Sequence, residues 1–461
     1  MMAGVAGGVG VMRRALTIAA GVAALLPVAA AAQDGATANG LQLDGTFRMR
    51  LEGIDNQFRP APAAANDLLL TFRTTVHARY RADAVEIGAE LIDSRAYLER
   101  DRSTVGTTEV NALELSQAYV GLDMGGVLGG DTRTRVTAGR FTMDIGSRRL
   151  VARNRFRNTI NAFTGVRLDV ETDDDDRLRA FWTLPHHRLP DDEEGIRHNR
   201  VVWDRESTDF QFFGASFTKA AVMGGTAEVY GYGLLERDGP DDETRDRHLF
   251  TGGFRLARNP RRGAFDYDLE ATYQAGHARV SAAPADRDDQ DVSAYLTHAE
   301  AGHTFAAAWS PRLSLHYDRA SGDGPGGSYG RFDTLFGARR SEFGPTSLYG
   351  AVQRANLSSP ALRLEAVPDK RLDGFLAYRA LWLAEATDSF ASTGVRDPSG
   401  RSGSFAGHQA EIGARYWLVP GLARLESGFA LLFKGDFLRN APDAPPGGTT
   451  RYGFIDVTVT F

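Results

Sequence analysis

The chain has 461 residues, a formal net charge of −6, no cysteine and 24% charged residues. The acidic balance argues against a nucleic-acid partner, and without disulfides the fold must depend on its own hydrogen bonds and packing. All but three of the 53 basic residues are arginine, the side chain suited to bidentate contact with carboxylate or phosphate. The nucleotide bias of a GC-rich genome explains the same excess, so composition leaves both explanations open.

The N-terminus has the pattern of an export signal. Two arginines follow Met12, an apolar run extends to Val28, and three alanines end at Ala32. We therefore expect residues 1–32 to be a signal peptide and residues 33–461 to form one domain. The apolar run is too short to span a bilayer comfortably, and no later segment offers about twenty consecutive apolar residues, so spanning by helices is excluded.

Strand-like alternation recurs from residue 41 to the C-terminus. Apolar residues or glycine at odd positions from Leu41 to Leu51 alternate with polar residues at even positions from Gln42 to Glu52. This period of two is typical of a strand with one apolar and one polar face. Eighteen strands are predicted, at 41–52, 69–82, 84–95, 111–122, 134–142, 162–171, 176–187, 208–219, 225–236, 247–258, 264–278, 291–307, 312–320, 359–366, 372–387, 408–419, 422–436 and 451–461.

The connections between these strands alternate in length. Pro420-Gly421 is one of the short ones, whereas 321–358 is the longest. Short periplasmic turns and long outer loops are typical of an up-and-down barrel in the outer membrane. An even number of strands also places both ends of the domain in the periplasm, in agreement with an export signal.

The last strand ends on an aromatic residue. Gly453, Ile455, Val457, Val459 and Phe461 share one face. An ordinary last strand of a soluble β-domain has the same pattern, but it would leave an apolar edge that invites aggregation, whereas a closed barrel has no edge.

The strand also resembles the closing strand of Gram-negative outer-membrane proteins, where it serves as the signal for the barrel-assembly machinery. We predict an all-β fold, a transmembrane antiparallel up-and-down β-barrel of about 18 strands. Its expected surroundings are outer-membrane lipid and lipopolysaccharide, with Phe461 as the assembly signal. At this strand number the lumen is wide enough for water, which makes transport the expected function.

Two loops carry most of the chemistry. The first, at 139–158, is rich in arginine and could bind carboxylates of an acidic polymer or phosphates of lipopolysaccharide. The alternative is a solvated loop tied down by neighbouring acids. The second, at 321–357, contains several apolar residues. It is expected either to fold into the lumen and set selectivity or to form an outer cap.

Motifs in these loops resemble the alginate-export family of outer-membrane proteins. They are Gly-x-x-Arg-Leu at 146–150, Arg-Asn at 157–158, Phe-x-Gly-Val-Arg at 163–167, Phe-Asp-Thr-Leu-Phe at 332–336 and the segment 428–436. The resemblance implies an eighteen-stranded barrel whose arginine-lined lumen passes an anionic polysaccharide outward. Two positions depart from the pattern: Gly337 stands where proline is usual, and Phe156 where tryptophan is frequent.

Charges on the predicted lumen faces are mixed, so selectivity would depend on one basic ring. The candidates for the substrate path are Arg73, Arg79, Arg81, Arg140, Arg149, Arg157, Arg167 and Arg179. Each could equally be a salt-bridged wall residue. No metal site is predicted, because the pair His186-His187 lacks a third ligand and the acidic runs 173–176 and 191–194 lack the ligand spacing of a calcium site. No cofactor is expected.

The leading hypothesis is an outer-membrane channel for an anionic polysaccharide or oligosaccharide, with a general diffusion porin for small solutes as the alternative. An enzyme would need a nucleophile with a base in reach, and no such set stands out. A surface adhesin would favour longer loops. No predicted short turn could act as a lid, so gating from the periplasmic side would need a partner protein.

Overall fold

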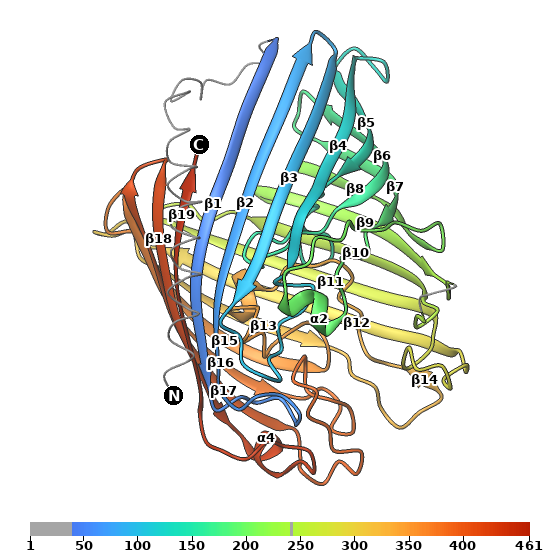
Figure 1. The fold of residues 1–461 in the computed structure, drawn as a ribbon. Helices are drawn as coiled ribbons and strands as arrows, with labels where there is room; N and C mark the ends of the chain where they lie inside the picture. The colour runs from blue at the N-terminus through green and yellow to red at the C-terminus, as the bar shows by residue number, and fades with distance from the viewer. Residues whose placement is uncertain (1–38, 240–242) are drawn as a thin grey trace.

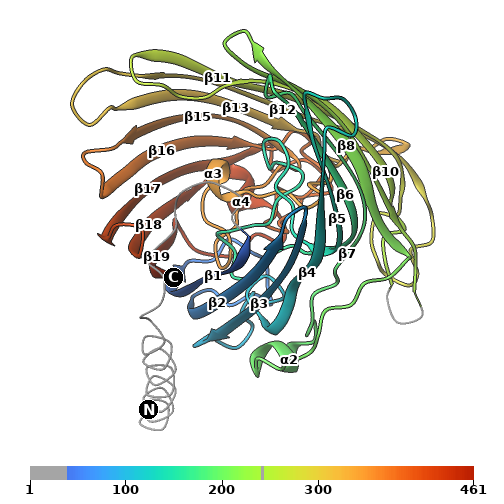
Figure 2. The same ribbon diagram turned by 90° about the horizontal axis from the view of Figure 1, so that it is seen from above.

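Eighteen long antiparallel strands form a closed barrel in the computed structural model, which describes residues 39–239 and 243–461 (Figures 1 and 2). The predicted signal peptide lies outside the described residues. The strands are β1 (Gly40–Asp55), β2 (Asp67–Ala82), β3 (Val85–Tyr97), β4 (Asn111–Gly125), β5 (Thr132–Phe141), β6 (Phe163–Thr172), β7 (Arg177–Pro185), β8 (Phe210–Val222), β9 (Gly225–Glu236), β10 (His248–Arg258), β11 (Ala264–Ala278), β12 (Gln290–Thr304), β13 (Arg312–Ala320), β15 (Leu357–Ala366), β16 (Leu372–Trp382), β17 (Phe405–Val419), β18 (Ala423–Lys434) and β19 (Thr450–Thr460). The predicted fold class and strand number are confirmed.

The barrel closes where the last strand pairs with the first. β19 runs antiparallel to β1, with Thr460 opposite Thr46 and Arg451 opposite Asp55. Beyond this ladder, the N–H of Phe461 donates to the carbonyl oxygen of Gly45 (3.0 Å), and Gly45 returns the bond (2.7 Å). A Cβ at Gly45 would come within 2.7 Å of the Phe461 ring, so the glycine leaves room for the terminal aromatic.

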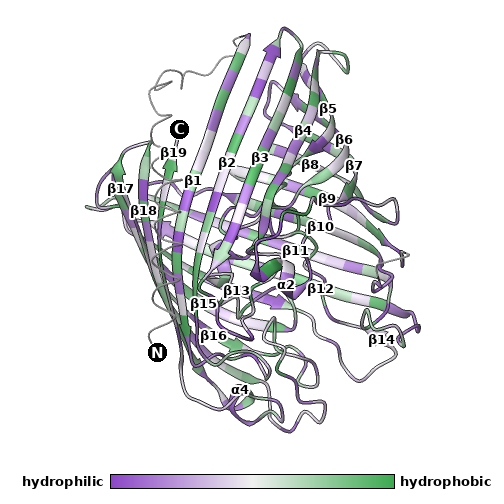
Figure 3. Ribbon diagram, viewed as in Figure 1, coloured by the Kyte–Doolittle hydropathy of each residue, from purple (hydrophilic) through white to green (hydrophobic). Residues whose placement is uncertain are grey.

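The outer face of the barrel wall is apolar and the inner face is polar, the opposite of the arrangement in a soluble protein. On β1, Leu41 and Leu43 are 70% and 60% exposed, whereas Arg48 and Arg50 are only 3% and 2% exposed. Figure 3 shows the same alternation of apolar and polar residues along β1, β2 and β3. Charged side chains turned inward and apolar ones turned outward suit a barrel surrounded by lipid.

The connections alternate in length, as predicted. Two-residue and other short turns, such as 83–84 and 223–224, gather at one end of the barrel together with the two ends of the described chain, here called the short-turn end. The long connections gather at the opposite, long-loop end, and the longest runs from 321 to 356.

In the described part of the chain, three short helices lie in the long loops. α2 (Glu193–Arg197) lies outside the ring of strands, α3 (Arg340–Phe343) lies inside it, and α4 (Asp436–Asn440) follows β18 (Figure 2). Among the described residues, no helix has the length and apolarity needed to cross a bilayer.

Two details of the strand prediction were wrong. The two-residue strand β14 (Ser328–Tyr329) was not predicted; it pairs in parallel with the start of β12. The fifteenth predicted strand, 372–387, corresponds to β16 and ends at Trp382. The chain leaves the sheet after Trp382. At Glu385 the main-chain groups bond to the side chain of Asn356 and not to a neighbouring strand: the Asn356 amide accepts from the Glu385 N–H (2.7 Å) and donates to the Glu385 carbonyl oxygen (3.0 Å).

Because the outer face is apolar and the lumen face is polar, an introduced arginine should destabilise the barrel on the outer face and be tolerated on the lumen face. Leu315 on β13 is 63% exposed on the outer face, whereas Thr75 on β2 lines the lumen. We expect Leu315→Arg to lower the free energy of unfolding in lipid vesicles by about 2–4 kcal/mol, because the guanidinium would face hydrocarbon. Thr75→Arg should change it far less. Urea unfolding of both variants checks this, and equal losses would contradict a lipid-facing outer surface.

Candidate functional site

A polar cavity of about 1520 Å³ occupies the lumen. It extends from the rim of the short-turn end, at Arg261 and Val367, to the interior loops, at Ile160 and Thr346. Its charged lining residues are Arg48, Arg50, Arg73, Arg148, Arg149, Arg153, Arg155, Arg255, Arg261, Arg262, Arg312, Arg340, Arg363, Arg415 and Arg424, with Asp44, Glu90, Asp144, Asp268, Glu300, Glu342, Glu365, Asp373, Glu426 and Asp456. Fifteen guanidiniums therefore face ten carboxylates.

The two loops singled out in the sequence meet inside the lumen. The N–H of Phe336 donates to the carbonyl oxygen of Leu150 (2.9 Å), and the N–H of Ala152 donates to that of Phe336 (3.2 Å). A further bond joins the N–H of Ala338 to the carbonyl oxygen of Arg148 (2.9 Å). The loop 142–162 and the loop 321–356 therefore form one hydrogen-bonded unit that narrows the passage.

Gly337 lies where the two loops are closest. A Cβ at this position would overlap the carbonyl oxygen of Arg149. Any other residue, including the proline usual at this position in the resembling family, would push the loops apart. The departure noted in the sequence is thus explained by close main-chain packing.

Three wall arginines hold the main chain of the first loop. Arg48 donates to the carbonyl oxygens of Phe156 (2.8 Å) and Arg157 (3.2 Å). Arg73 donates to those of Arg155 (2.9 Å) and Arg157 (3.0 Å), and Arg50 to that of Phe156 (3.0 Å). The carbonyl groups of this turn are thereby satisfied by cations of β1 and β2.

The same turn is seated on the closing strand. The ring of Phe156 meets that of Phe454 on β19 edge to face, with centroids 5.4 Å apart, and the guanidinium of Arg50 lies 3.8 Å from the Phe156 centroid. Arg50 also pairs with Asp456 on β19 (3.0 Å). This contact accounts for Phe454, the one apolar residue on the otherwise polar face of the last strand.

Arg149 anchors the second point of contact between loop and wall. Its guanidinium pairs with Asp268 (3.0 Å) and Glu270 (2.5 Å) on β11 and with Glu342 of α3 (2.7 Å). Burial alone would lower the pKa of Arg149, but these carboxylates raise it well above its ordinary value. Burial likewise would raise the pKa of Glu342, but Arg149 and Arg354 hold it well below its usual range. Arg149 and Glu342 therefore stay ionised.

The eight predicted arginines lie in different surroundings. Arg73 and Arg149 line the cavity, whereas the other six do not. Their nearest partners are Asp44 for Arg79, Glu86 and Asp123 for Arg81, Glu114 and Glu206 for Arg140, Asn161 for Arg157, and Asp169 for both Arg167 and Arg179. The structure does not bring the eight into one ring.

Among the cavity arginines with weak acid pairing, sequence reasoning singled out Arg73 but not Arg48, Arg148 or Arg155. Arg48 and Arg73 bond only main-chain and amide oxygens, and Arg148 has no ion pair among the described residues. Arg155 pairs with Asp144 (3.1 Å) but keeps 73% of its side chain exposed. Alternation places Arg48 inside the barrel, but only the fold shows which carboxylates come within reach.

A closed barrel with an apolar outer face and a charged, water-accessible lumen defines an outer-membrane channel. Residues 40–447 match the family described as "Alginate export". The chain belongs to this family.

Solved structures show the same fold. Pseudomonas aeruginosa OccD3 (OpdP) is 15% identical, with a TM-score of 0.53 and 94% of each chain covered. P. aeruginosa OccK5 (OpdH) is 10% identical, with a TM-score of 0.56 and 93% of this chain and 99% of that chain covered. P. aeruginosa OccK2 (OpdF), in complex with glucuronate, is 12% identical, with a TM-score of 0.55 and 92% and 99% covered. No functionally curated protein matches the sequence.

The pairing of the two loops can be tested at Gly337. Gly337→Ala should loosen the loops, because overpacking costs about 1–3 kcal/mol and each 1.4 kcal/mol changes the undocked population about tenfold. We expect a larger and noisier single-channel conductance in planar bilayers. The matched control is Gly326→Ala in the same loop, where a Cβ meets nothing within 4 Å. Identical traces for the two variants would contradict the role of the loop contact.

Proposed function

We propose that this channel passes an anionic polysaccharide or oligosaccharide, of the uronate type, through the arginine-lined cavity. The observation that carries the proposal is the excess of guanidiniums over carboxylates in the cavity lining. Carboxylates at regular intervals along a uronate chain match guanidiniums along a wall, since arginine binds carboxylates in a bidentate manner.

The position of the weakly paired arginines supports this solute class. Arg48, Arg73, Arg148 and Arg155 lie on the first interior loop and on the wall that it touches. A cation already neutralised by an acid offers little to an arriving anion, whereas a cation held by main-chain oxygens has no carboxylate to offset it. A passing carboxylate would thus meet net positive charge at the loop contact.

The comparisons support the same class without naming the solute of this chain. The family is described by the export of alginate, which is a polymer of uronic acids, and the similar OccK2 structure contains glucuronate. The family and the fold are those of transport channels, so the proposal includes no catalytic step.

The proposal extends to location and assembly. Residues 1–32 would direct export, Phe461 would be read by the barrel-assembly machinery, and the apolar outer face would contact lipid and lipopolysaccharide. The short-turn end would then face the periplasm. Its turns are too short to form a lid, so closure from that side would need a periplasmic partner; recovery of no such protein with the native channel would count against that part.

Single-channel recording tests the solute class. We expect anion-selective current in potassium chloride that is blocked by an added oligo-uronate. The double variant Arg148→Gln, Arg155→Gln should raise the half-blocking concentration about tenfold, which is about 1.4 kcal/mol and within what one lost charged hydrogen bond contributes.

The control for this experiment removes one charge outside the passage. Arg197→Gln alters α2, which lies outside the ring of strands (Figure 2), and should leave the block unchanged. Weakly selective current without block would instead favour a general diffusion porin for small solutes. An equal effect of both variants would refute a specific role of the loop arginines.

A further inference from the structure

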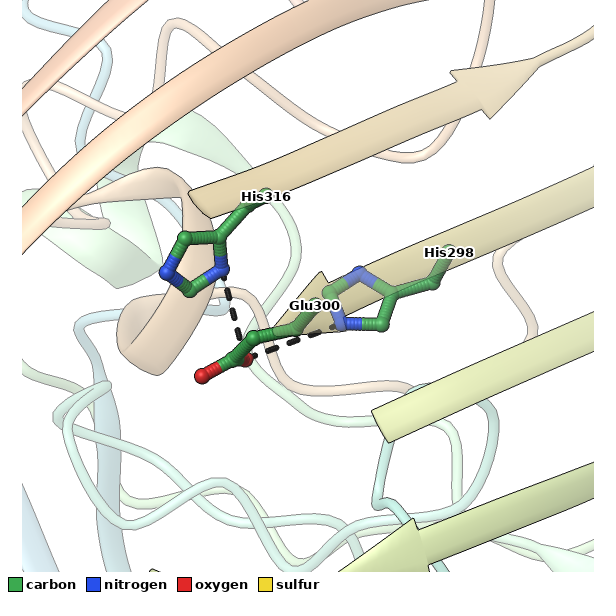
Figure 4. A group of neighbouring side chains, drawn as sticks. All are labelled: His298, Glu300 and His316. Atoms are coloured by element: carbon green, nitrogen blue, oxygen red, sulfur yellow. Dashed lines mark ion pairs between the residues drawn. The ribbon is translucent and has the colours of Figure 1, made fainter. Parts of the chain in front are cut away.

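Two histidines and a glutamate of adjacent strands converge on the lumen wall. His298 and Glu300 lie on β12 and His316 lies on β13. Figure 4 shows the Nε2 atom of His298 and the Nδ1 atom of His316 both directed at one carboxylate oxygen of Glu300. The distances are 3.8 Å and 3.3 Å, and all three ligand atoms lie within 4.8 Å of one another.

These separations fit a shared metal ion better than mutual hydrogen bonds. Tetrahedral ligands at metal–ligand distances near 2.0–2.1 Å stand about 3.3 Å from each other, close to the two separations between the imidazole nitrogens and Glu300. The two nitrogens are buried, with 0% and 7% of the side chains of His298 and His316 exposed. Neither nitrogen has a hydrogen-bond partner. Buried ring nitrogens without partners are costly, and a metal ion would satisfy both at once.

The opposite ring nitrogens are oriented by neighbouring side chains. The Nδ1 atom of His298 lies 2.6 Å from Asp318, and the Nε2 atom of His316 lies 2.8 Å from the hydroxyl of Ser314. The carboxylate behind His298 favours the tautomer that leaves its Nε2 atom with a free lone pair, as in established metal sites. The hydroxyl behind His316 can accept from the Nε2–H group, and the Nδ1 atom then has the free lone pair.

The two carboxylate oxygens of Glu300 have different partners. Its Oε1 atom pairs with Arg312 (2.5 Å), which steadies the side chain. Its Oε2 atom is the one that the two imidazoles face. A second grouping of His298 with Asp318 and Glu342 is geometrically similar, but those carboxylates are already bound by arginines, so the Glu300 side is the stronger candidate.

We propose that His298, Glu300 and His316 bind a divalent transition-metal ion of the zinc class. Two imidazoles and one carboxylate suit zinc, copper, nickel or iron and disfavour magnesium and calcium, which prefer oxygen ligands. Glu300 and His316 line the cavity, so the ion enters from the lumen and its fourth position faces the passage. The ion cross-links β12 and β13 and adds positive charge to the wall. This site is independent of the solute that the channel passes.

The test measures metal bound to the folded, full-length barrel. The protein is stripped with a chelator, loaded with Zn²⁺, passed through gel filtration and analysed for metal content. We expect one zinc per chain, and Co²⁺ in its place should give the visible absorption of a tetrahedral site. His316→Gln and, separately, Glu300→Gln should weaken zinc binding about tenfold or more.

The matched control is His77→Gln, because His77 lines the same cavity but lies outside the cluster. It should retain zinc as the unaltered protein does, and heat-dependent gel mobility checks that each variant forms a barrel. Absence of retained zinc, or equal retention by His316→Gln and His77→Gln, would overturn the proposal.

Discussion

The constraint on which this structure depends is that lipid offers no hydrogen-bond partner to the main chain. Every strand must therefore find a neighbour on both sides, and the ladder between β1 and β19 is what makes this true of the first and the last strand. Closure then fixes the direction of every side chain, because alternate residues must face lipid or lumen. The buried arginines and exposed leucines of β1 are consequences of that single requirement.

Inside the ring, charge works beside two buried apolar clusters to hold the interior loops. Guanidiniums of Arg48, Arg50 and Arg73 satisfy the main-chain carbonyls of the first interior loop, and Arg149 joins that loop to β11 and α3. The loops in turn narrow a lumen that eighteen strands would leave wide. The same residue type therefore holds the loops and lines the cavity, and in the proposed function the arginines with weak acid pairing are those that meet the solute.

The alternation of apolar and polar residues and the lengths of the connections predicted the eighteen strands. Both signals are encoded by residues that lie close together in the sequence. The interior pairing of Leu150 with Phe336 and the need for Gly337 depend on contacts between residues nearly two hundred positions apart, which no local pattern encodes. The same holds for the predicted arginines: Arg79 and Arg149 look alike in sequence, yet only Arg149 lines the cavity. His298 and His316 escaped notice because their convergence depends on the β12–β13 register.

The seat of Phe156 on Phe454 has a consequence for biogenesis. Phe156 is held by Arg50 of β1 and by Phe454 of β19, the first and the last strand to be synthesised. The complete docking site therefore forms only when β1 and β19 have paired. A barrel still open at this seam lacks the part of the docking site that Phe454 and Asp456 provide. The narrow passage is therefore a product of completed assembly, and a defective last strand would yield a leaky pore as well as an unstable wall.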